Sequence, residues 1–350
     1  MSSIHVIDNP IRDPRWMDLV ERHPAASIFH TPAWLEALRR TYGYEPFVAT
    51  ISAKPRLESG LVVCRVTRWG SSRLVSLPFS DHCEPLVSDP RELHDIVAGL
   101  LTLDGRRSRT LELRPASAPP VHAALIEGGL RAGRTYCLHR LDLRPDNDRL
   151  FAGFHPSSTQ RAIRRAEREG VTCAVGTSDD LLAAFYRLLR MSRRRHRLPP
   201  PPIAWFRNLR AAMGDRLALH VASHDGQPVA ALLALSLKST LFYKYGGSDA
   251  ARHRLGAMPL LFWQTMRWAK DRGATELDLG RSDLDQPGLM AFKDHLGATR
   301  SRLTYYEHPS PRATATPGPA WLSRAAGRVF ARLPDAALDL AGRLIYRHLG

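Results

Sequence analysis

Apolar and polar positions follow one another most regularly in the second half of the chain. Two segments, residues 216–223 and 228–237, have the character of strands and flank an Asp225-Gly226 turn, which is typical of a tight β-hairpin. Residues 258–272 then carry apolar side chains at helical spacing, with a proline in the first turn and a glycine beyond the end. The pattern predicts a hairpin followed by a helix.

An aromatic and glycine-rich segment precedes this helix, and charged segments follow it. Residues 242–249 are expected to form a strand, 276–283 a strand that ends in a turn, and 288–297 a short helix. Only five of the fifty basic side chains are lysines, and two of them, Lys244 and Lys293, lie in these segments. We therefore expect the chemistry of the protein here.

The first half repeats the same order of elements. Residues 47–51 and 60–67 are expected to be strands, 91–103 a helix and 110–113 a further strand. Matching strands of the two halves are 166 and 168 residues apart. This offset predicts two tandem copies of one α/β unit.

Residues 143–148 interrupt the pattern with proline, acidic and amide side chains, and so indicate a linker. We expect a first domain over residues 1–148, a second, catalytic domain over 149–308, and a linker with amphipathic helices over 309–350. The second domain is expected to begin with a helix at 157–169, a strand at 171–175, and a helix that Ser178-Asp179-Asp180 caps and that ends near Arg195.

The C-terminal segment has a pattern of its own. Residues 308–319 are expected to form a loop, and 321–349 alternate apolar and basic positions at helical spacing, with a break at Pro334. This spacing predicts two tail helices that pack on the body of the protein. A peripheral contact with the inner face of a membrane is the alternative.

Composition narrows the class of protein. With 350 residues and 44% apolar content, the chain can bury one large core or two of ordinary size. Its four cysteines show no spacing typical of zinc ligands or of a disulfide framework, so we expect no metal and a reducing compartment. We find neither a signal peptide nor an apolar run long enough to span a bilayer, and we expect a soluble, cytoplasmic protein.

The formal net charge of +16 comes almost entirely from arginine. One set of arginines recurs at helical spacing, and a second set repeats that spacing about thirty residues later: Arg161, Arg164, Arg165 and Arg168, then Arg190, Arg193, Arg194 and Arg197. Such a stripe could hold phosphates of a nucleotide-linked substrate or of a tRNA, because guanidinium groups bind phosphate oxygens in pairs. A solvated helix face explains the same spacing equally well.

Several motifs together resemble the FemAB-like branch of the GNAT acyltransferase fold. They are the run Ser157 to Val171, Tyr243-x-Tyr245-Gly246-Gly247, Trp268-Ala269-x-x-x-Gly273, Gly280-Arg281-Ser282 and Phe292-Lys293, with Phe29 to Leu35 and Ser76 to Phe79 in the first half. The resemblance implies an α/β fold with two tandem GNAT-like acyl-CoA N-acyltransferase domains, each a mixed central sheet flanked by helices. It also implies an acyltransferase that moves an acyl or aminoacyl group to an amine of a cell-wall or cell-surface polysaccharide precursor.

The resemblance suggests a role for Lys293. An amine that attacks an ester or thioester passes through an oxyanion, which a fixed positive charge stabilises. The Phe292-Lys293 pair matches that of Fem-type transferases, where the lysine stabilises the developing charge. The alternative is an exposed helix lysine beside Asp294. Asp278 and Asp283 are the candidate proton acceptors, although Asp278 could instead pair with Arg281.

Two tyrosines and an arginine are candidate substrate-binding groups. Tyr243 and Tyr245 should share one face of their strand, because alternate strand residues point to the same side. They could then line the acceptor cleft together, or serve only as buried structural residues. Arg281 could bind a phosphate or a carboxylate of the substrate.

The donor is open between acyl-CoA and aminoacyl-tRNA. In GNAT enzymes the CoA pyrophosphate lies at a helix N-terminus after a pattern like Arg/Gln-x-x-Gly-x-Gly/Ala. Arg252, Arg254, Gly256 and Ala257 stand at that place, but His253 and Met258 depart from the pattern. An aminoacyl-tRNA donor needs no such loop, yet the chain lacks the coiled-coil insertion that many Fem-type enzymes carry.

Other functions, within and beyond acyl transfer, are compatible with parts of the sequence. One is an acyl-CoA-dependent N-acetyltransferase for a small amine or amino sugar. A nucleic-acid-binding protein would explain the charge, but no zinc spacing, RNA-binding strand motif or free basic tail accompanies it. A non-catalytic scaffold would leave Phe292-Lys293 unexplained. A hydrolase built on His82-Cys83 is disfavoured because adjacent strand residues point apart. Neither the acceptor nor the oligomeric state follows from the sequence.

Overall fold

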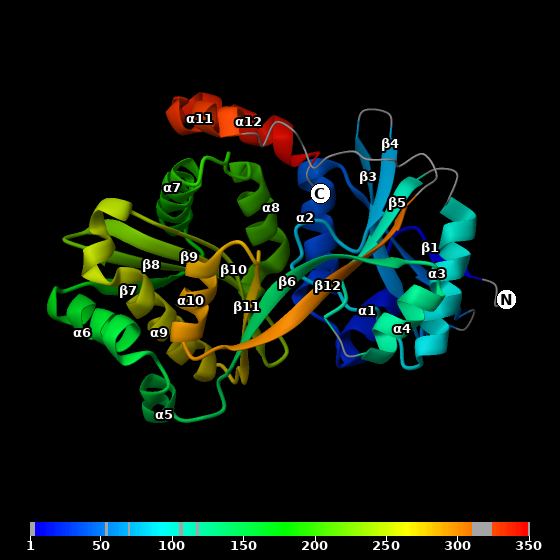
Figure 1. The fold of residues 1–350 in the computed structure, drawn as a ribbon, viewed down its shortest axis with the longest axis horizontal. Helices are drawn as coiled ribbons and strands as arrows, with labels where there is room; N and C mark the ends of the chain where they lie inside the picture. Colours follow the sequence, from blue (N-terminus) through cyan, green and yellow to red (C-terminus); the bar gives the residue numbers. More distant parts are fainter. Residues whose placement is uncertain are drawn as a thin grey trace.

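One mixed sheet runs through the computed structural model, which describes residues 4–52, 55–68, 71–104, 108–116, 119–309 and 324–348 (Figure 1). Within these residues the sheet has 12 strands in the order β1-β2-β3-β4-β5-β12-β6-β11-β10-β9-β8-β7. Helices cover both faces (Figure 1). The expected α/β class is confirmed.

The first half supplies one end of the sheet. Its strands are β1 (His5–Ile7), β2 (Glu45–Thr50), β3 (Leu61–Arg68), β4 (Ser71–Val75) and β5 (Ser108–Leu113). They are antiparallel neighbours except for the parallel pair β4 and β5. Its helical elements are α1 (Pro14–Arg22), η1 (Ile28–His30), α2 (Pro32–Tyr42), α3 (Pro90–Asp104) and α4 (Pro119–Glu127).

The second half supplies the other end. Its strands are β7 (Thr172–Gly176), β8 (Leu217–His224), β9 (Gln227–Leu237), β10 (Thr240–Ser248) and β11 (Glu276–Ser282). Its helical elements are α5 (Asn147–Ala152), the π-helical turn η2 (Pro156–Gln160), α6 (Arg161–Arg168), α7 (Asp179–Arg195), α8 (Ile203–Met213), η3 (Gly214–Arg216), η4 (Ala250–Leu255), α9 (Ala257–Lys270) and α10 (Pro287–His295).

Local sequence signals account for several of these boundaries. The β8–β9 hairpin turns at Asp225 and Gly226, whose φ angles of 50° and 71° are the positive values that such a turn requires. The side chain of Ser178 accepts a hydrogen bond from the Leu181 N–H and so caps α7. The predicted hairpin and helix start are both confirmed.

The internal repeat is visible in the order of elements. The first copy runs β3-β4-α3-β5-α4-β6 and the second runs β9-β10-α9-β11-α10-β12. In each copy the second and third strands form a parallel pair, β4 with β5 and β10 with β11. The predicted tandem repeat is therefore confirmed.

The last strand of each copy crosses to the other half. β6 (Arg131–Asp142) follows the first copy but pairs with β11, and β12 (Thr299–Pro309) follows the second copy but pairs with β5. β6 and β12 also pair with each other at the centre of the sheet (Figure 1). The domain divisions at residues 148 and 308 stay predictions, and the sheet is continuous across both halves.

The expected loop at 308–319 is wrong at its start, because residues 308 and 309 still belong to β12. Their backbone is held by the neighbouring strand β5, a long-range pairing that local sequence does not reveal. The remainder of that expected loop lies outside the described residues.

Apolar side chains from both halves form the largest core, on one face of the sheet. Trp34 of α2 meets Trp205 of α8 edge to face, with 5.2 Å between ring centroids. A second core lies under α9, and a third lies under α3 and α4. The halves are thus joined by a shared core as well as by exchanged strands.

The tail helices α11 (Arg324–Arg332) and α12 (Asp335–Tyr346) pack on the body, as expected. The Tyr44 hydroxyl donates to the Tyr346 carbonyl over 3.1 Å. Arg190 and Arg194 of α7 form ion pairs with Asp335, so these two members of the second arginine stripe have structural partners. None of the helices in the described ranges has the length and apolar character needed to cross a membrane.

Candidate active site

The parallel strands β10 and β11 diverge at the centre of the molecule. They pair only from Thr240 to Phe242 against Glu276 to Asp278, and beyond this point both strands have an irregular register. In β10 the irregularity is a bulge at Lys244, because Tyr243 lies opposite Ala234 and Tyr245 opposite Leu233. The two strands therefore separate beyond Phe242 and Asp278, and we call this point of separation the opening.

The bulge overturns the prediction that the two tyrosines share a face. One extra residue between them reverses the alternation of side chains, so Tyr243 packs on Phe262 of α9 and Tyr245 on Phe206 of α8. The Tyr245 hydroxyl accepts a hydrogen bond from the Trp205 indole at 3.0 Å, and burial raises its pKa. Both tyrosines are half-buried: Tyr245 packs against the largest core, whereas Tyr243 packs against the core under α9.

A strained loop from the first half reaches this opening. In the segment 76–82, Leu77 and Phe79 have φ angles of 63° and 62°, which residues with a Cβ rarely adopt. Buried Arg114 braces the loop by donating to the Leu77 and Ser80 carbonyls at 3.1 and 3.0 Å. Such backbone strain persists only where surrounding groups hold the loop in place. The loop in turn positions the polar side chains at its end, Asp81 and His82.

Asp81 lies at the end of this loop and pairs with Lys244 of the bulge. The Lys244 Nζ is 2.8 Å from Asp81 Oδ2, and its side chain is 7% exposed. Burial lowers the pKa of Lys244, while the Asp81 charge partly offsets that effect. The Tyr305 hydroxyl donates to the Asp81 carbonyl at 2.6 Å. The pair joins the two halves across the opening.

His82 forms a second buried pair between the halves. Its Nε2 lies 2.8 Å from Asp278 Oδ2, and both side chains are almost fully buried. Burial alone would raise the pKa of Asp278, but His82, Arg140 and the Gly280 N–H together lower it to about 2. The carboxylate is thus ionised and its oxygens are engaged, so this geometry favours an orienting role over the proton-accepting role predicted for Asp278.

Lys293 lies on α10 with its side chain buried against the end of β11. Its Nζ donates to the Gly280 carbonyl at 2.8 Å and to the Arg281 carbonyl at 3.1 Å. Burial lowers the pKa of Lys293 to about 8, although the nearby Asp81 and Asp278 charges favour its protonated form. An ammonium group has three donors, so the two carbonyls leave one N–H for a further acceptor. The alternative of an exposed surface lysine is therefore wrong.

These side chains, Asp81, His82, Lys244, Asp278 and Lys293, form what we call the central polar cluster. Asp278 and Lys293 are predicted from the sequence, whereas Asp81 and the contact of His82 with Asp278 are not. The run Ser76 to Phe79 was the available signal, since Asp81 and His82 follow its last residue at two and three positions. As expected, His82 and its neighbour Cys83 point apart, and the Cys83 thiol lies 3.4 Å from His30 instead.

Two other predicted site residues border the cluster. The Arg281 guanidinium lies over the rings of Tyr136 and Tyr305, at 4.1 and 5.2 Å from their centroids. Phe292 is half-buried, and its ring packs on Phe262. Arg281 therefore does not form the predicted pair with Asp278 in this structure, where Arg140 takes that place.

Asp283 lies away from this buried arrangement. It is exposed in the turn before α10, where it accepts a hydrogen bond from the Gln286 side chain at 3.3 Å. The structure thus separates the two candidate proton acceptors, Asp278 and Asp283. The role of Asp283 as a base stays a prediction, and the exposed position of this residue does not favour it.

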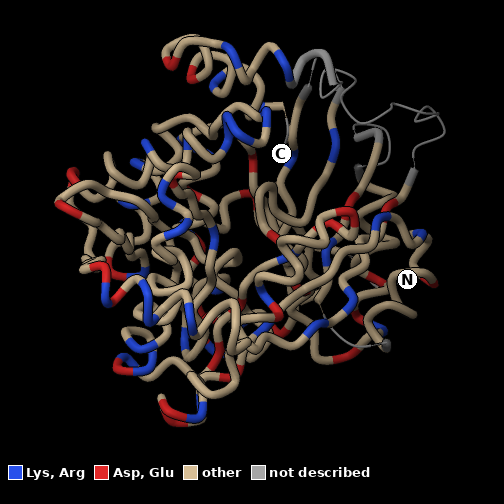
Figure 2. The backbone as a smooth tube through the Cα atoms, turned by 60° about the vertical axis from the view of Figure 1, so that its left-hand side comes forward, with Lys and Arg blue, Asp and Glu red and all other residues tan. Residues whose placement is uncertain are grey.

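The predicted phosphate-binding arginines come together in space. Arg161 and Arg164 are exposed on α6, and Arg165 donates to the Arg254 carbonyl at 2.8 Å, which links α6 to η4. Arg252 and Arg254 are exposed on η4. Elsewhere, basic positions are interspersed with acidic ones along the backbone (Figure 2). The arginines of α6 and η4 therefore form one basic edge beside the start of α9.

The start of α9 is itself closely covered. Gly256 has a φ angle of 78°, and a Cβ there would lie 2.3 Å from the Ala162 carbonyl oxygen of α6. Its N–H donates to the His253 carbonyl at 3.1 Å, and Ala257 is buried. These contacts leave little room for a pyrophosphate at Gly256 and Ala257, although both keep the predicted place at the helix start.

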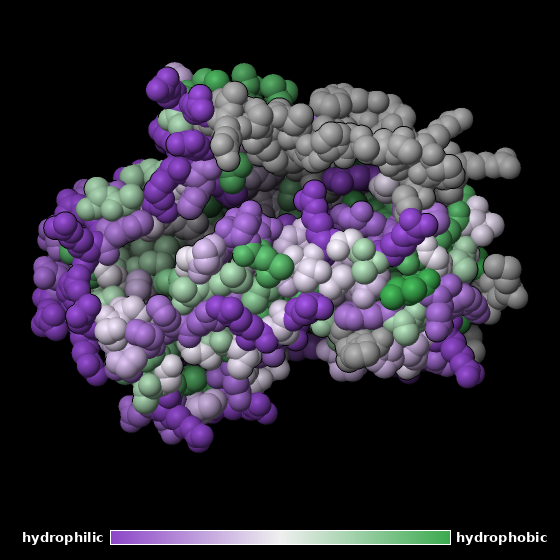
Figure 3. Space-filling model, viewed as in Figure 1, coloured by the Kyte–Doolittle hydropathy of each residue, from purple (hydrophilic) through white to green (hydrophobic). Residues whose placement is uncertain are grey.

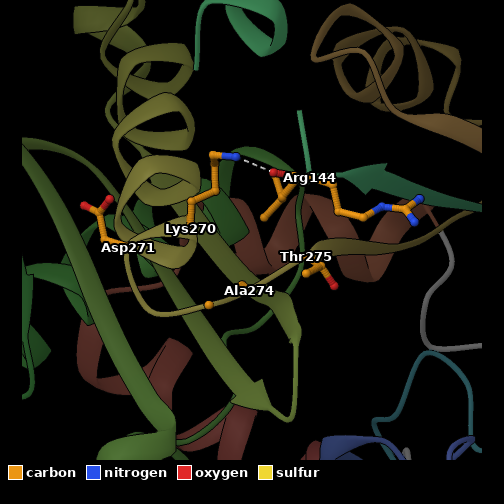
Figure 4. Close-up of a pocket in the computed structure, with 7 residues that line it drawn as sticks. Arg144, Lys270, Asp271, Ala274 and Thr275 are labelled. Atoms are coloured by element: carbon orange, nitrogen blue, oxygen red, sulfur yellow. Dashed lines mark hydrogen bonds between the residues drawn. The ribbon is translucent and has the colours of Figure 1, made fainter. Parts of the chain in front are cut away.

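The structure also has a hollow of about 410 Å³ before the start of β11 (Figure 4). Lys270 and Thr275 line it, and the Lys270 side chain donates to the Leu143 carbonyl. None of the predicted site residues lines this hollow. Within the described ranges, no three His, Cys, Asp or Glu side chains gather in a way that could hold a metal ion.

Comparisons with known proteins agree with this architecture. The family model of an acetyltransferase (GNAT) domain matches residues 156–294. The solved structure described as FemX has a TM-score of 0.66 at 14% sequence identity, and the match covers 83% of this chain and 94% of that one. The chain has the tandem GNAT fold of FemX. The resemblance and the fold expected from the motifs are thereby confirmed.

Two further proteins extend the comparison. A tandem GNAT protein from the clavulanic acid biosynthesis pathway has a TM-score of 0.57 at 15% identity, over 89% of this chain and 100% of that one. A UDP-N-acetylmuramoylpentapeptide-lysine N(6)-alanyltransferase of Weissella viridescens is 28% identical over 142 residues. That match covers 40% of this chain, and the chain spans about two fifths (42%) of the length of this curated relative.

Proposed function

We propose that this tandem GNAT protein transfers an acyl or aminoacyl group to an amine of a nucleotide-linked cell-wall or cell-surface polysaccharide precursor. The observation that carries the proposal is the buried Lys293, held at the divergence of β10 and β11 with one donor to spare. The similarity to an alanyltransferase that acts on a UDP-linked muramoyl pentapeptide supports this substrate class.

Lys293 would stabilise the charge that develops during transfer. The amine nitrogen forms a bond to the donor carbonyl carbon, and the carbonyl oxygen becomes an oxyanion. The remaining N–H of Lys293 is available to that oxygen, and its ammonium charge stands in a buried environment where electrostatic stabilisation is strong. When the intermediate collapses, the bond to the donor alcohol or thiol breaks, and Lys293 donates a proton to this leaving group. Lys293 then regains a proton from solvent, and the group that accepted the amine proton releases it to solvent, so that both residues return to their starting states.

His82 is the proton acceptor that the geometry supports best. Because Asp278 is ionised, the hydrogen in their 2.8 Å contact belongs to His82 Nε2. When the imidazole carries only this hydrogen, Nδ1 can accept the proton that the attacking amine loses. Asp278 then acts as a positioning residue that fixes the tautomer, an arrangement common to catalytic histidines.

The covered start of α9 favours aminoacyl-tRNA over acyl-CoA as the donor. A CoA pyrophosphate would need the N–H groups near Gly256, where the Ala162 carbonyl lies close and the Gly256 N–H is already engaged. The exposed arginines of α6 and η4 remain available to phosphates of either a tRNA or a nucleotide-linked acceptor. The proposed reaction takes place in the cytoplasm, where both substrates would be present.

The test combines both donors with one nucleotide-linked acceptor. Purified protein is incubated with a UDP-linked muramoyl pentapeptide and either mixed aminoacyl-tRNA or acetyl-CoA, and the acceptor is analysed by mass spectrometry. We expect an acceptor heavier by one amino-acid residue, formed only with aminoacyl-tRNA. An acetylated acceptor would reverse the choice of donor, and an unchanged acceptor with both donors would overturn the proposal.

Substitution of Lys293 links the product to the central polar cluster. We expect Lys293→Ala to lower kcat by roughly 10²- to 10³-fold with little change in KM, as for loss of an oxyanion donor. Lys270→Ala is the matched control, because Lys270 also donates to two backbone carbonyls but lies outside the cluster. Equal losses in both variants would contradict the assigned role.

A further inference from the structure

The tail helices present a surface of unusual composition on the side away from the body. On α12, Leu340 and Leu344 are 54% and 58% exposed, and on α11 Val329 is 57% exposed. Figure 3 shows hydrophobic residues on the upper edge of the molecule, where Figure 1 places both helices. We call the exposed side chains of this side the outer tail surface: Val329, Leu340 and Leu344, with Arg328, Arg332, Arg343 and Arg347.

Helical spacing puts the members from α12 on one face. Leu340, Leu344 and Arg347 recur at intervals of four and three, and Arg343 lies one position from Leu344. The opposite face holds Leu338, Gly342 and Tyr346, which are buried against the body. At Gly342 a Cβ would lie 2.2 Å from the Pro200 carbonyl oxygen, so the inner face has no room to turn outward.

The charge of the outer tail surface is of one sign, because both acidic side chains of the tail contact α7, although Asp335 remains 47% exposed. Asp335 pairs with Arg190 and Arg194 of α7 at 2.5 and 2.6 Å. Asp339 accepts a hydrogen bond from the Tyr186 hydroxyl at 3.1 Å and lies 3.4 Å from Arg190. These are the only carboxylates among residues 324–348. The outer side therefore combines arginines with aliphatic side chains and has no acidic residue.

We infer that the outer tail surface binds an anionic lipid bilayer, with α11 and α12 lying in the plane of its interface. Aliphatic side chains would enter the acyl boundary, and the arginines would contact lipid phosphates, as in interfacial amphipathic helices. A nucleic acid would satisfy the arginines but leave the leucines in water. A second copy of the chain would place arginines opposite arginines in a symmetric contact. The inference does not depend on the proposed transfer reaction.

Cosedimentation of the 350-residue protein with vesicles tests the inference. We expect binding to vesicles of phosphatidylcholine with phosphatidylglycerol, weaker binding at high salt, and none to phosphatidylcholine alone. Because one arginine near an anionic surface contributes about fivefold to partitioning, Arg343→Gln with Arg347→Gln should weaken binding roughly 25-fold. Leu340→Ser with Leu344→Ser should also abolish most of it.

Matched controls separate a membrane contact from a general surface effect. Leu103→Ser with Ile126→Ser removes two equally exposed apolar side chains elsewhere, at 58% and 55% exposure, and should leave binding unchanged. Failure to bind anionic vesicles, or equal loss in the control, would overturn the inference. The inference would also be overturned if the protein formed a dimer in solution that only the Leu340→Ser with Leu344→Ser variant disrupts. That result would show that the outer tail surface binds a second copy of the chain. Neither result bears on transfer to a soluble acceptor, which is measured without vesicles.

Discussion

At the scale of single residues, burial changes what two charged groups can do. Lys293 keeps its ammonium group in a nearly closed site, and the cost of removing that charge from water brings its pKa to about 8. Asp278 is equally buried, but His82, Arg140 and a backbone N–H hold it ionised with a pKa of about 2. Desolvation thus sets the direction of the pKa shift at Lys293, whereas at Asp278 the neighbouring charges and hydrogen bonds outweigh it.

The lowered pKa of Lys293 predicts an alkaline limit to activity. Since the protonated amine is the proposed donor, kcat should fall about tenfold per pH unit above pH 8, while Lys293→Arg should be slower but lack this limb. The unfolded state holds more protons between pH 8 and the ordinary lysine value of 10.5, so the contribution of Lys293 to stability should rise with pH in that window. A pH profile of kcat with unfolding curves measures both effects, and an unchanged alkaline limb in Lys293→Arg would assign it to another group.

At the scale of elements, β10 carries much of the site through its irregularity. The bulge at Lys244 directs that side chain to Asp81 and separates the two tyrosines onto opposite faces. Two glycines, Gly246 and Gly247, follow in the strand at positions where a Cβ would be too close to neighbouring atoms. A Cβ on Gly246 would lie 2.5 Å from the Tyr243 hydroxyl oxygen, and one on Gly247 would lie 2.5 Å from backbone atoms of Leu188 and Leu189 in α7. The motif is thus explained by close packing as well as by chemistry.

Gly247→Ala should therefore be strongly destabilising. Backbone atoms of α7 cannot rotate away as a side chain does, so we expect a loss of about 3 kcal/mol in the free energy of unfolding. In Gly288→Ala, where no atom lies within 4 Å, we expect a change between zero and about 1 kcal/mol of stabilisation. Urea unfolding of both variants measures the difference. Similar stability of the two proteins would show that α7 can shift freely from β10.

At the scale of the whole molecule, strand exchange makes the two copies depend on each other. β6 lies between β11 and β12, and β12 lies between β5 and β6. Separation at residue 148 would take both neighbours from β6 and would also leave an edge on β5 and on β11. The cluster would be divided as well, because Asp81 and His82 come from the first half and Lys244, Asp278 and Lys293 from the second.

We accordingly expect fragments 1–148 and 149–350 not to fold when expressed alone, and to form a folded complex when expressed together. The intact chain should unfold in a single transition, because strands and core cross the division. Circular dichroism and urea titration of each fragment, of the pair and of the intact chain provide the measurement. Cooperative unfolding of either fragment alone would show that the halves are independent.

Local signals in the sequence determined the elements that do not need a distant partner. The Asp225-Gly226 hairpin, the α7 cap at Ser178 and the repeated order of strands and helices all follow from backbone preferences and periodicity. The Phe292-Lys293 motif also pointed to the lysine that the structure buries at the site. These features depend on neighbours within a few residues, which a single sequence displays.

Only the tertiary structure decided which side chains meet. β6 and β12 gain their places through pairing with strands of the opposite half, and the Lys244 bulge reversed a face assignment that alternation had predicted. His82 and Asp278 are 196 positions apart in sequence, so nothing local could pair them. Long-range pairing and a single inserted residue change side-chain partners without changing local propensity. For this reason the contact between His82 and Asp278 became visible only in the fold.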